Sequence, residues 1–413
     1  MVEDKPSVAL VGALDTKAAE YGYVRDRLAS AGVLSVLVDA GVLGSAAIEP
    51  DIDRYTVAVA GGGELDTLAA GGNRNNAMVV MARGAAATVR DLLDRSQVAG
   101  VMMLGGSNAG YIMSQVSAAL PIGCPKMLVS TIVAGDTRPY VGTSDLTMMY
   151  PVVDIAGLNS ISRLILARAA DACAGMVRGA PVSDYEAGKQ VVGFSMFGVT
   201  TACVTAVHDA LIGGGTETHI FHANGTGGRS LEAMARSGLF SAVADVTTTE
   251  LADELLGGVC SAGPDRLTGA ADSRVPQVVS VGALDMVNFG ALQTIPARFH
   301  GRLFHAHNPA VTLMRTNAEE NASLGRIIAE KLNRSTAFVE VHVPARGFSQ
   351  ISVKGAPFYD PRSDGALITA LREHLDPRIP LLVHDAAIND PSFALEITTA
   401  LFRALDSKKG NEK

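Results

Sequence analysis

The sequence predicts an α/β fold made of two Rossmann-like lobes, each a mainly parallel sheet flanked by helices. The chain has 413 residues, more than a single hydrophobic core usually organises. Apolar residues make up 48% and charged residues 18%, with 43 glycines, a composition typical of buried strands joined by tight turns. Short apolar runs alternate with helical segments, which favours parallel strands joined by helical crossovers.

A polar, turn-rich stretch at Gly179–Gly188 indicates the boundary between the lobes. We therefore predict an N-terminal nucleotide-binding-like domain over residues 1–180 and a C-terminal domain over residues 190–407. The net charge of −8 argues against a broad basic face for nucleic acid. The sequence contains no apolar run of the ~18 residues that a membrane span needs, its start lacks the apolar core of a signal peptide, and its four cysteines are far apart. We expect a cytoplasmic protein that binds neither nucleic acid nor membrane.

The first β-α-β unit is predicted from a strand at Ser7–Val11, a helix ending near Ala31 with Asp15 or Thr16 as its N-cap, and a strand at Val33–Val38. The loop between the first strand and the helix should face a ligand, and it contains Gly12, Asp15, Thr16 and Lys17. Asp39 ends the second strand, where nucleotide-binding folds place an acid on the ribose; a turn aspartate is the alternative. The sequence contains neither G-x-G-x-x-G in this unit nor a P-loop motif.

A second strand-turn-helix follows the apolar run that begins at Val101. Its glycine turn offers further anion-binding residues, namely Gly105, Gly106, Ser107 and Asn108. The glycine- and asparagine-rich segment at residues 60–76, before a helix over Asn76–Asp94, is long enough to cover a site. The hydroxyl-rich segment Ser130–Asp145 is predicted to be either a ligand wall or a well-capped loop.

In the C-terminal domain, a strand at Gln190–Phe197 and a helix at Thr200–Leu211 precede a buried strand at Thr218–Ala223. A glycine turn then leads into a helix from about Arg229. Helix N-termini favour anions, so we predict an anion seat, with plain turn chemistry as the alternative. The residues of the predicted seat are Gly225, Thr226, Gly227, Gly228 and Arg229.

The remaining C-terminal elements continue the α/β alternation, with Gly257–Val275 expected as a surface excursion. Strands are predicted at Val243–Val246, from Val278, at Ala337–Val343 and at Leu381–Val383, and helices at Thr248–Leu256, Ala318–Leu332, Asp364–His374 and Pro391–Leu405. The letters Val-Gly-Ala-Leu-Asp occur twice, ending at Asp15 and at Asp285. Five residues do not prove a duplication, although they agree with two similarly built halves.

Histidines gather in the C-terminal domain, and three residues there are candidates for proton transfer: His307, His384 and Asp385. His305 and His307 alternate along a strand as a metal pair would, but no third ligand stands at a recognisable spacing. We therefore assign no metal ligands. Mg²⁺ held jointly with a substrate phosphate is plausible at the loop acids Asp285, Asp360 and Asp364.

Several motifs stand in a familiar order over Ser7–Leu405. They are Gly12-Ala-Leu-Asp-Thr-Lys17, Tyr140-Val-Gly-Thr-Ser-Asp145, Ile155-Ala-Gly-Leu-Asn159, Phe221-His-Ala-Asn-Gly-Thr-Gly-Gly-Arg229, Gly282-Ala-Leu-Asp-Met-Val-Asn-Phe289, His307-Asn-Pro309 and Gly355-Ala-Pro-Phe-Tyr-Asp-Pro361. Together they resemble the ATP-binding family typified by the N-terminal region of the plant tobamovirus-resistance protein. The resemblance implies two α/β lobes, ATP binding without a P-loop, and homodimers. The chain departs from the family pattern at Ala13, where Thr is usual, and at Ser352, where Asp is usual.

Together these observations predict a protein that binds ATP with Mg²⁺ and acts on or senses a small anionic metabolite in a cleft between the domains. Whether it is an enzyme stays open. One alternative is a non-catalytic, nucleotide-dependent partner-binding module. Another is a metal-dependent lyase or hydrolase that uses no nucleotide.

Overall fold

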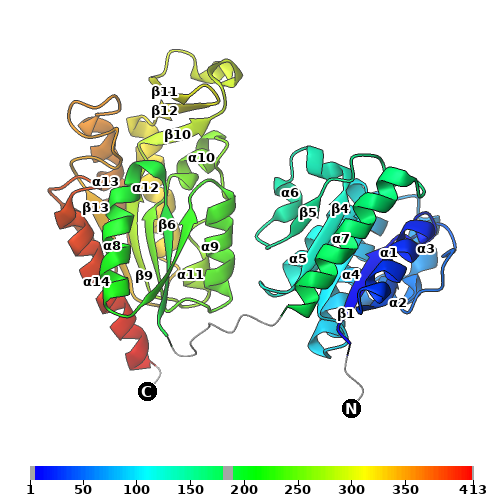
Figure 1. The fold of residues 1–413 in the computed structure, drawn as a ribbon. Coiled ribbons are helices and arrows are strands. Elements are labelled where there is room, and N and C mark those ends of the chain that lie inside the picture. The colour runs from blue at the N-terminus through cyan, green and yellow to red at the C-terminus, as the bar shows by residue number, and fades with distance from the viewer. Residues whose placement is uncertain (1–4, 180–188, 412–413) are drawn as a thin grey trace. The chain divides into compact units, whose positions relative to one another are not determined.

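The computed structural model describes residues 5–179 and 189–411 (Figure 1). The chain divides into two compact units between Asp184 and Tyr185. We call them unit 1, described over residues 5–179, and unit 2, described over residues 189–411. Apart from Gly179, the predicted boundary stretch Gly179–Gly188 lies outside the described residues.

Unit 1 is built on a five-stranded sheet with the order β2-β1-β3-β4-β5. Every neighbouring pair is parallel. The strands are β1 (Ser7–Gly12), β2 (Leu34–Asp39), β3 (Gly100–Gly105), β4 (Lys126–Ser130) and β5 (Thr147–Met149). The chain passes from β1 outward to β2 and then returns to the other side of β1 at β3. The strand order therefore reverses between β1 and β3, and ligands of doubly wound sheets bind at such a switch point.

Helices cover both faces of this sheet because alternate residues of a strand point to opposite sides. Val8 and Leu10 of β1 pack toward α1 and α7, whereas Ala9 and Val11 pack toward α2, α4 and α5. The helices are α1 (Ala18–Ser30), α2 (Arg54–Ala60), α3 (Leu65–Ala70), α4 (Arg74–Asp94), α5 (Ser107–Ala119), α6 (Arg138–Val141) and α7 (Ser160–Arg178). The first helix begins later than predicted, with Lys17 rather than Asp15 or Thr16 as its N-cap.

Unit 2 contains a six-stranded sheet with the order β14-β13-β9-β8-β6-β7. Its neighbouring pairs are again all parallel. The strands are β6 (Val191–Met196), β7 (Glu217–His222), β8 (Ala242–Thr247), β9 (Gln277–Gly282), β13 (Val339–Pro344) and β14 (Leu381–His384). In chain order this is the doubly wound arrangement of unit 1 with one further strand, so its switch point lies between β6 and β8.

The helices of unit 2 also form two layers. α8 and α14 pack on one face of the sheet, while α9 and α11 to α13 pack on the other (Figure 1). Their bounds are α8 (Thr201–Gly213), α9 (Thr226–Arg236), α10 (Glu250–Leu256), α11 (Gly269–Asp272), α12 (Ala318–Leu332), α13 (Pro361–His374) and α14 (Pro391–Asn411). Short 3-10 turns lie at Thr131–Ala134, Gly198–Thr200, Leu292–Thr294 and Ala297–Phe299. The predicted fold class of two Rossmann-like lobes is confirmed.

A small antiparallel sheet in unit 2 was not predicted. It has the order β10-β12-β11, formed by β10 (Met286–Phe289), β11 (Phe304–Asn308) and β12 (Val311–Arg315). β7, predicted as a buried strand, is instead the sheet's edge, and its residues are only partly covered. The repeated Val-Gly-Ala-Leu-Asp lies on β1, the first strand of unit 1, and on β9, the fourth strand of unit 2. These positions are not equivalent in the two sheets, so the repeat does not fall on matching strands of the two units.

Candidate functional site

The clearest candidate site is a cavity of about 590 Å³ in unit 1. It lies beyond the carboxyl ends of β1 and β3, at the switch point of the sheet. Eight of the predicted binding residues line it: Gly12, Asp15, Thr16, Lys17, Gly105, Gly106, Ser107 and Asn108. Because β1 and β3 are neighbours in the sheet, two loops about 90 residues apart in sequence form one wall.

Tyr21 of α1 closes the floor between these two strands. Its hydroxyl donates to the carbonyl of Val11 and accepts from the backbone N–H of Leu104 at 3.0 Å. The ring packs so closely under the first loop that a Cβ on Gly12 would lie 2.1 Å from it. Burial raises the pKa of Tyr21, so the hydroxyl stays protonated. Glycine at position 12 is therefore required by close packing.

The second loop presents the N-terminus of α5 to the cavity. Gly105 has φ of 147°, a conformation that favours glycine. Gly106 is the N-cap, and no side chain in the described structure caps the helix. The first N–H groups of a helix lack intrahelical acceptors and carry the positive end of its dipole. The lining residues Ser107 and Asn108 thus stand where a phosphate or carboxylate would bind.

A second wall of the cavity is mainly apolar. It is formed by the loop after β2 and by α3, α4 and α5, with Val42, Leu43, Leu68, Met78 and Ile112 among its side chains. Leu43 is 84% exposed. The segment predicted to cover a site supplies Leu68, Ala69, Gly72 and Arg74, so it does border the cavity. Sequence reasoning missed the rest of this wall because its members come from separate elements.

Two charged groups of the first loop are arranged differently. The Asp15 Oδ2 accepts from the N–H of Gly44 at 3.0 Å, whereas its Oδ1 is buried and has no hydrogen-bond partner among the described residues. The Lys17 Nζ donates to the carbonyl of Ile155, which ties α1 to the segment before α7. Asp15 therefore keeps one carboxylate oxygen without a partner among the described residues, while the ammonium group of Lys17 is already engaged.

Asp39 is buried and is bonded to other residues of unit 1. It is 1% exposed, accepts from the N–H groups of Leu14 and Gly41 at 3.2 and 2.9 Å, and forms an ion pair with Arg54 at 2.9 Å. It is not among the residues that line the cavity. The interpretation as a turn aspartate, and not the ribose contact, fits this geometry.

In unit 2, the N–H groups of the predicted anion seat donate to a carboxylate of the protein itself. The Glu250 Oε1 accepts from the N–H of Gly225 at 2.6 Å and from that of Gly228 at 3.1 Å, and Glu250 is fully buried. The Gly227 N–H donates to the Asn224 Oδ1 at 3.2 Å. The seat therefore binds an internal anion, which corrects the prediction of an external one.

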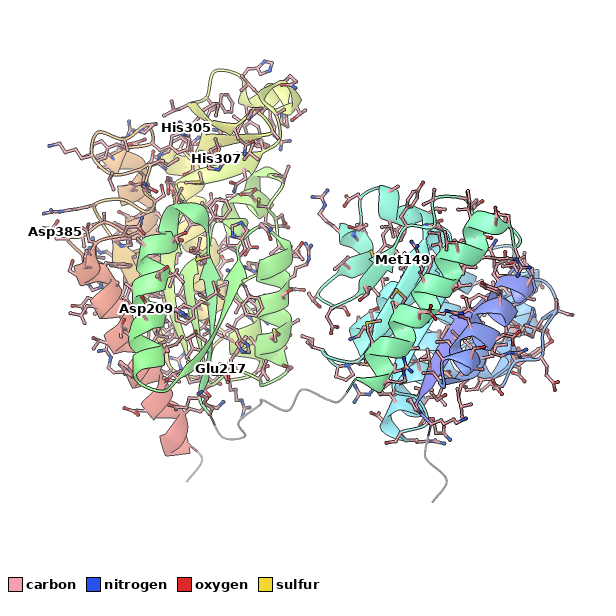
Figure 2. The ribbon with its side chains drawn as sticks, in the orientation of Figure 1. Met149, Asp209, Glu217, His305, His307 and Asp385 are labelled. Carbon is pink, nitrogen blue, oxygen red and sulfur yellow. The ribbon has the colours of Figure 1, made fainter. Side chains whose placement is uncertain are left out.

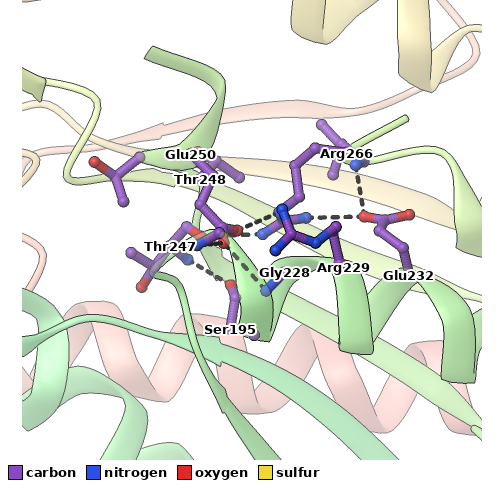
Figure 3. Close-up of polar contacts among 12 residues, drawn as sticks. Ser195, Gly228, Arg229, Glu232, Thr247, Thr248, Glu250 and Arg266 are labelled. Atoms are coloured by element: carbon purple, nitrogen blue, oxygen red, sulfur yellow. Dashed lines mark hydrogen bonds and ion pairs between the residues drawn. The ribbon is translucent and has the colours of Figure 1, made fainter. Parts of the chain in front are cut away.

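Glu250 belongs to a buried cluster that we call the Arg266 cluster, consisting of Glu232, Asp245, Glu250 and Arg266. Figure 3 shows Arg266 with Glu232 and Glu250. The guanidinium of Arg266 lies 2.6 Å from Glu250, 2.6 Å from Asp245 and 3.0 Å from Glu232. Glu232 also accepts from the N–H groups of residues 267–269. Arg266 is fully buried, so Gly257–Val275 is not a surface excursion as predicted. The other seat residues are also engaged, since Arg229 donates to Thr226 Oγ1 at 3.3 Å.

The three proton-transfer candidates do not form one site. His307 is exposed on β11, and Asp385 follows β14 (Figure 2), where it forms an ion pair with Arg346 at 2.5 Å. The His384 Nε2 lies 3.0 Å from the His342 Nδ1, with the two rings stacked. Burial lowers the pKa of His384, which favours a neutral ring. None of the three lines the cavity of unit 1.

The loop acids considered for Mg²⁺ are held by the protein. Asp360 caps α13 by accepting from the N–H of Ser363 at 3.1 Å, and Asp364 pairs with Arg315 at 2.5 Å. Asp285 is fully buried, and its Oδ2 accepts from the Ser349 hydroxyl at 2.7 Å, whereas its Oδ1 has no hydrogen-bond partner among the described residues. Over residues 5–179 and 189–411, no group of three or more His, Cys, Asp or Glu side chains is placed to hold a metal ion.

The structure also shows the surroundings of Asp145 and Ser352. Asp145, in the hydroxyl-rich segment, accepts from the N–H of Gly123 at 2.7 Å and pairs with Lys126 at 2.5 Å, as in a well-capped loop. Ser352 is fully buried, and its Oγ accepts from the N–H of Ser349 at 3.0 Å. No helix among the described residues is long and apolar enough to span a bilayer.

Comparison with known proteins identifies the family. Residues 6–181 match the N-terminal domain, and residues 189–405 the C-terminal domain, of the uncharacterised protein family UPF0261. The chain belongs to this family. A UPF0261 protein of Clostridium tetani is 42% identical over 400 residues, which cover 97% of this chain and 99% of that protein.

The UPF0261 match also reaches a plant protein. The tomato ToMV resistance protein Tm-1(GCR237) is 42% identical over 327 residues, which cover 78% of this chain and 43% of the tomato protein. The predicted resemblance to the family of the plant tobamovirus-resistance protein is thereby confirmed, whereas ATP binding stays a prediction. Among solved structures, a UDP-N-acetylglucosamine 2-epimerase from Rickettsia bellii aligns over 98% of this chain and 96% of its own, at 10% identity and a TM-score of 0.24. That score is too low to support an argument.

Proposed function

We propose that this UPF0261 protein binds ATP in the cavity of unit 1 and uses the nucleotide to act on or sense a small anionic metabolite. The observation that carries the proposal is the position of the cavity. It lies at the switch point between β1 and β3 and opens onto the uncapped N-terminus of α5. This is where doubly wound sheets bind nucleotides, with phosphates at a helix N-terminus.

The two walls of the cavity suit the two ends of a nucleotide. Phosphates would accept from the N–H groups of Ser107 and Asn108, and the base would lie against Leu43, Leu68 and Met78. The volume of about 590 Å³ falls within the roughly 300–1,000 Å³ typical of small-molecule sites. A mainly apolar pocket with a few placed polar groups is also the usual composition of such sites.

The residues present also fit a magnesium ion carried by the nucleotide. Mg²⁺ in nucleotide sites is usually held by one or two carboxylates together with substrate phosphates. Asp15 lines the cavity, and its Oδ1 is buried with no hydrogen-bond partner among the described residues. Asp15 would hold the ion, whose charge would offset that of the phosphates. Asp285, Asp360 and Asp364 belong to unit 2, do not line this cavity and are not part of this proposal.

Binding is better supported than turnover. The proton-transfer candidates His307, His384 and Asp385 belong to unit 2 and do not line the cavity. The proposal therefore does not include a catalytic residue for hydrolysis. A nucleotide-dependent partner-binding module would use the same cavity in the same way.

A glycine substitution tests the cavity directly. A Cβ on Gly106 would have no described atom within 4 Å, other than its immediate neighbours, so Gly106→Leu should fold normally and place its side chain at the phosphate position. We expect Mg²⁺–ATP to raise the melting temperature of the wild type. Saturation at 100 times Kd adds roughly 2.7 kcal/mol to the free energy of unfolding. Calorimetric titration should show that Gly106→Leu has lost this binding.

Gly175→Leu is the matched control. Gly175 is an exposed residue of α7, and a Cβ there also meets open space, so this variant should bind ATP as the wild type does. Unchanged ATP binding by Gly106→Leu would show that the nucleotide lies elsewhere. If millimolar ATP stabilises neither the wild type nor the control, the proposed nucleotide site is wrong.

A further inference from the structure

The cavity of unit 1 is lined by two cationic side chains, Lys17 and Arg74, and they are not equivalent. Lys17 is the N-cap of α1, and its Nζ donates to the carbonyl of Ile155. If Lys17 turned toward a ligand, that carbonyl would lose its charged donor. A charge-assisted hydrogen bond of this kind typically contributes roughly twice as much as a neutral one. Lys17 is therefore occupied in holding unit 1 together.

Arg74 is in the opposite situation. It is the first residue of α4, is exposed, and makes no hydrogen bond or ion pair with any described residue. Its neighbours fix its backbone: the Asn73 side chain caps α4 by accepting from the N–H of Asn76 at 3.0 Å. Gly72 has φ of 63°. A glycine turn thus brings a free guanidinium to the cavity at the end of a capped helix.

The surroundings of Arg74 favour a phosphate as its partner. Among the described residues, Asp15 is the only acidic side chain that lines the cavity, and its Oδ2 already accepts from Gly44. α4 packs against α5, whose uncapped N-terminus borders the same space. Guanidinium groups bind phosphate oxygens through pairs of parallel N–H donors. A phosphate at α5 would then accept from backbone N–H groups on one side and from Arg74 on the other.

We infer that Arg74, and not Lys17, is the cation that binds the phosphate groups of the nucleotide. The inference rests on the proposed function, because it concerns the same cavity. It has a consequence for specificity. The affinity for ligands should depend on Arg74 more strongly as the number of phosphates increases, while a nucleoside without phosphate should not depend on it.

The test compares Arg74→Ala with Arg83→Ala by calorimetric titration with Mg²⁺–ATP, ADP and adenosine. Arg83 is a matched control because it is an exposed arginine of the same helix that does not line the cavity. We expect Arg74→Ala to weaken ATP binding by about 10- to 100-fold, the range for losing a hydrogen bond to a charged group. Adenosine binding should not change, and Arg83→Ala should match the wild type with all three ligands.

Lys17→Ala and the melting temperatures without ligand complete the test. Lys17→Ala should lower the melting temperature without ligand, because it removes the bond to Ile155, and Arg74→Ala should not. Equal ATP affinities for Arg74→Ala and Arg83→Ala would overturn the role of Arg74 but leave nucleotide binding intact. An equal loss of ATP and adenosine binding in Arg74→Ala would also overturn it. A wild type that binds none of the three ligands would overturn both this inference and the proposed function.

Discussion

Units 1 and 2 share a doubly wound strand order, but the switch point is open in unit 1 and filled by side chains in unit 2. In unit 1 the space between the ends of β1 and β3 is a cavity of about 590 Å³. In unit 2 the corresponding ends of β6 and β8 are filled by protein. There the Thr200 and Thr247 hydroxyls bond to each other at 2.7 Å, and Asp245 of β8 accepts from the Ser195 hydroxyl of β6 at 2.6 Å.

The two units differ in the source of the anion that the backbone N–H groups of a glycine turn can bind. Backbone N–H groups at a glycine turn attract an anion in either unit. In unit 2 that anion is Glu250, which lies at the start of α10 and is neutralised by Arg266. In unit 1, α5 begins with Ser107 and Asn108, and no side chain among the described residues caps its N-terminus. The same backbone arrangement is thus structural in one unit and open to a ligand in the other.

The largest effect on stability should come from replacing Arg266, the cation at the filled switch point of unit 2. Arg266→Met leaves three buried carboxylates without their shared partner. Breaking a buried ion pair in this way typically costs about 3–5 kcal/mol. We expect unit 2 to unfold at much lower urea while unit 1 keeps its stability. Hydrogen–deuterium exchange with mass spectrometry would assign the loss to each unit.

Arg346→Ala is the control for that experiment, because Arg346 forms an ion pair with Asp385 at the surface of the same unit. Exposed pairs contribute little to stability, so this variant should unfold as the wild type does. If Arg266→Met is no less stable than Arg346→Ala, the Arg266 cluster does not hold unit 2 together. The two switch points would then not differ in what they contribute to stability.

An intermediate effect on stability is expected from a larger side chain at Gly12, beside the open switch point of unit 1. A Cβ on Gly12 would lie 2.1 Å from the ring of Tyr21, so Gly12→Ala must displace that ring and its bonds to Val11 and Leu104. Overpacking of this kind costs about 1–3 kcal/mol. Urea unfolding followed by tyrosine fluorescence suits this test, since most of the tyrosines belong to unit 1.

Gly106→Ala provides the comparison, since its Cβ would enter open space. It should leave the unfolding midpoint near that of the wild type. Equal midpoints for Gly12→Ala and Gly106→Ala would mean that Tyr21 moves freely. In that case the wall of the cavity would not be rigid.

The smallest expected effect is on the pH dependence of stability. Burial raises the pKa of Asp285 to about 6, from a usual value near 3.8. A carboxyl whose pKa is raised by folding contributes stability that is fully present below about pH 3.8 and is lost as the pH rises through about 6. Asp285→Asn should therefore reduce the loss of unit 2 stability between pH 5 and pH 7 by roughly 1 kcal/mol.

The comparison of wild type with variant is essential, because other groups titrate nearby. Burial raises the pKa of Asp253 and of Asp364 to about 7, and this acts in the same direction as Asp285. Burial lowers the pKa of His342 and of His384, which acts in the opposite direction below pH 6.5. Urea midpoints at pH 5 and pH 7 give the two slopes. Identical slopes would show that Asp285 does not titrate in this range.

Local patterns in the sequence determined much of the fold and one wall of the cavity. α12 has the predicted bounds Ala318–Leu332, and its N-cap Asn317 forms a capping box with Glu320, a signal contained in four consecutive residues. The loops at Gly12–Lys17 and Gly105–Asn108 could also be predicted, because each is a strand, a glycine turn and a helix in direct succession. In a parallel sheet such turns meet at one edge.

Contacts between distant residues required the tertiary structure. Glu250 lies 25 residues after Gly225, and no spacing rule predicts that a buried carboxylate would return to that turn. Arg266 was missed for the same reason, since its partners come from α9, β8 and α10. Leu68 and Arg74 join the cavity through α3 and α4, and Leu43 joins it through the loop after β2.

The sequence by itself thus determined that both units carry glycine turns able to bind an anion, because hydrogen-bond donors at a helix start follow from local backbone geometry. Only the tertiary structure decided which turn is free to do so. A carboxylate from elsewhere in the chain folds onto the turn at Gly225–Arg229. The helix that begins at Ser107 has no such partner among the described residues, and it borders a cavity that also has an apolar wall.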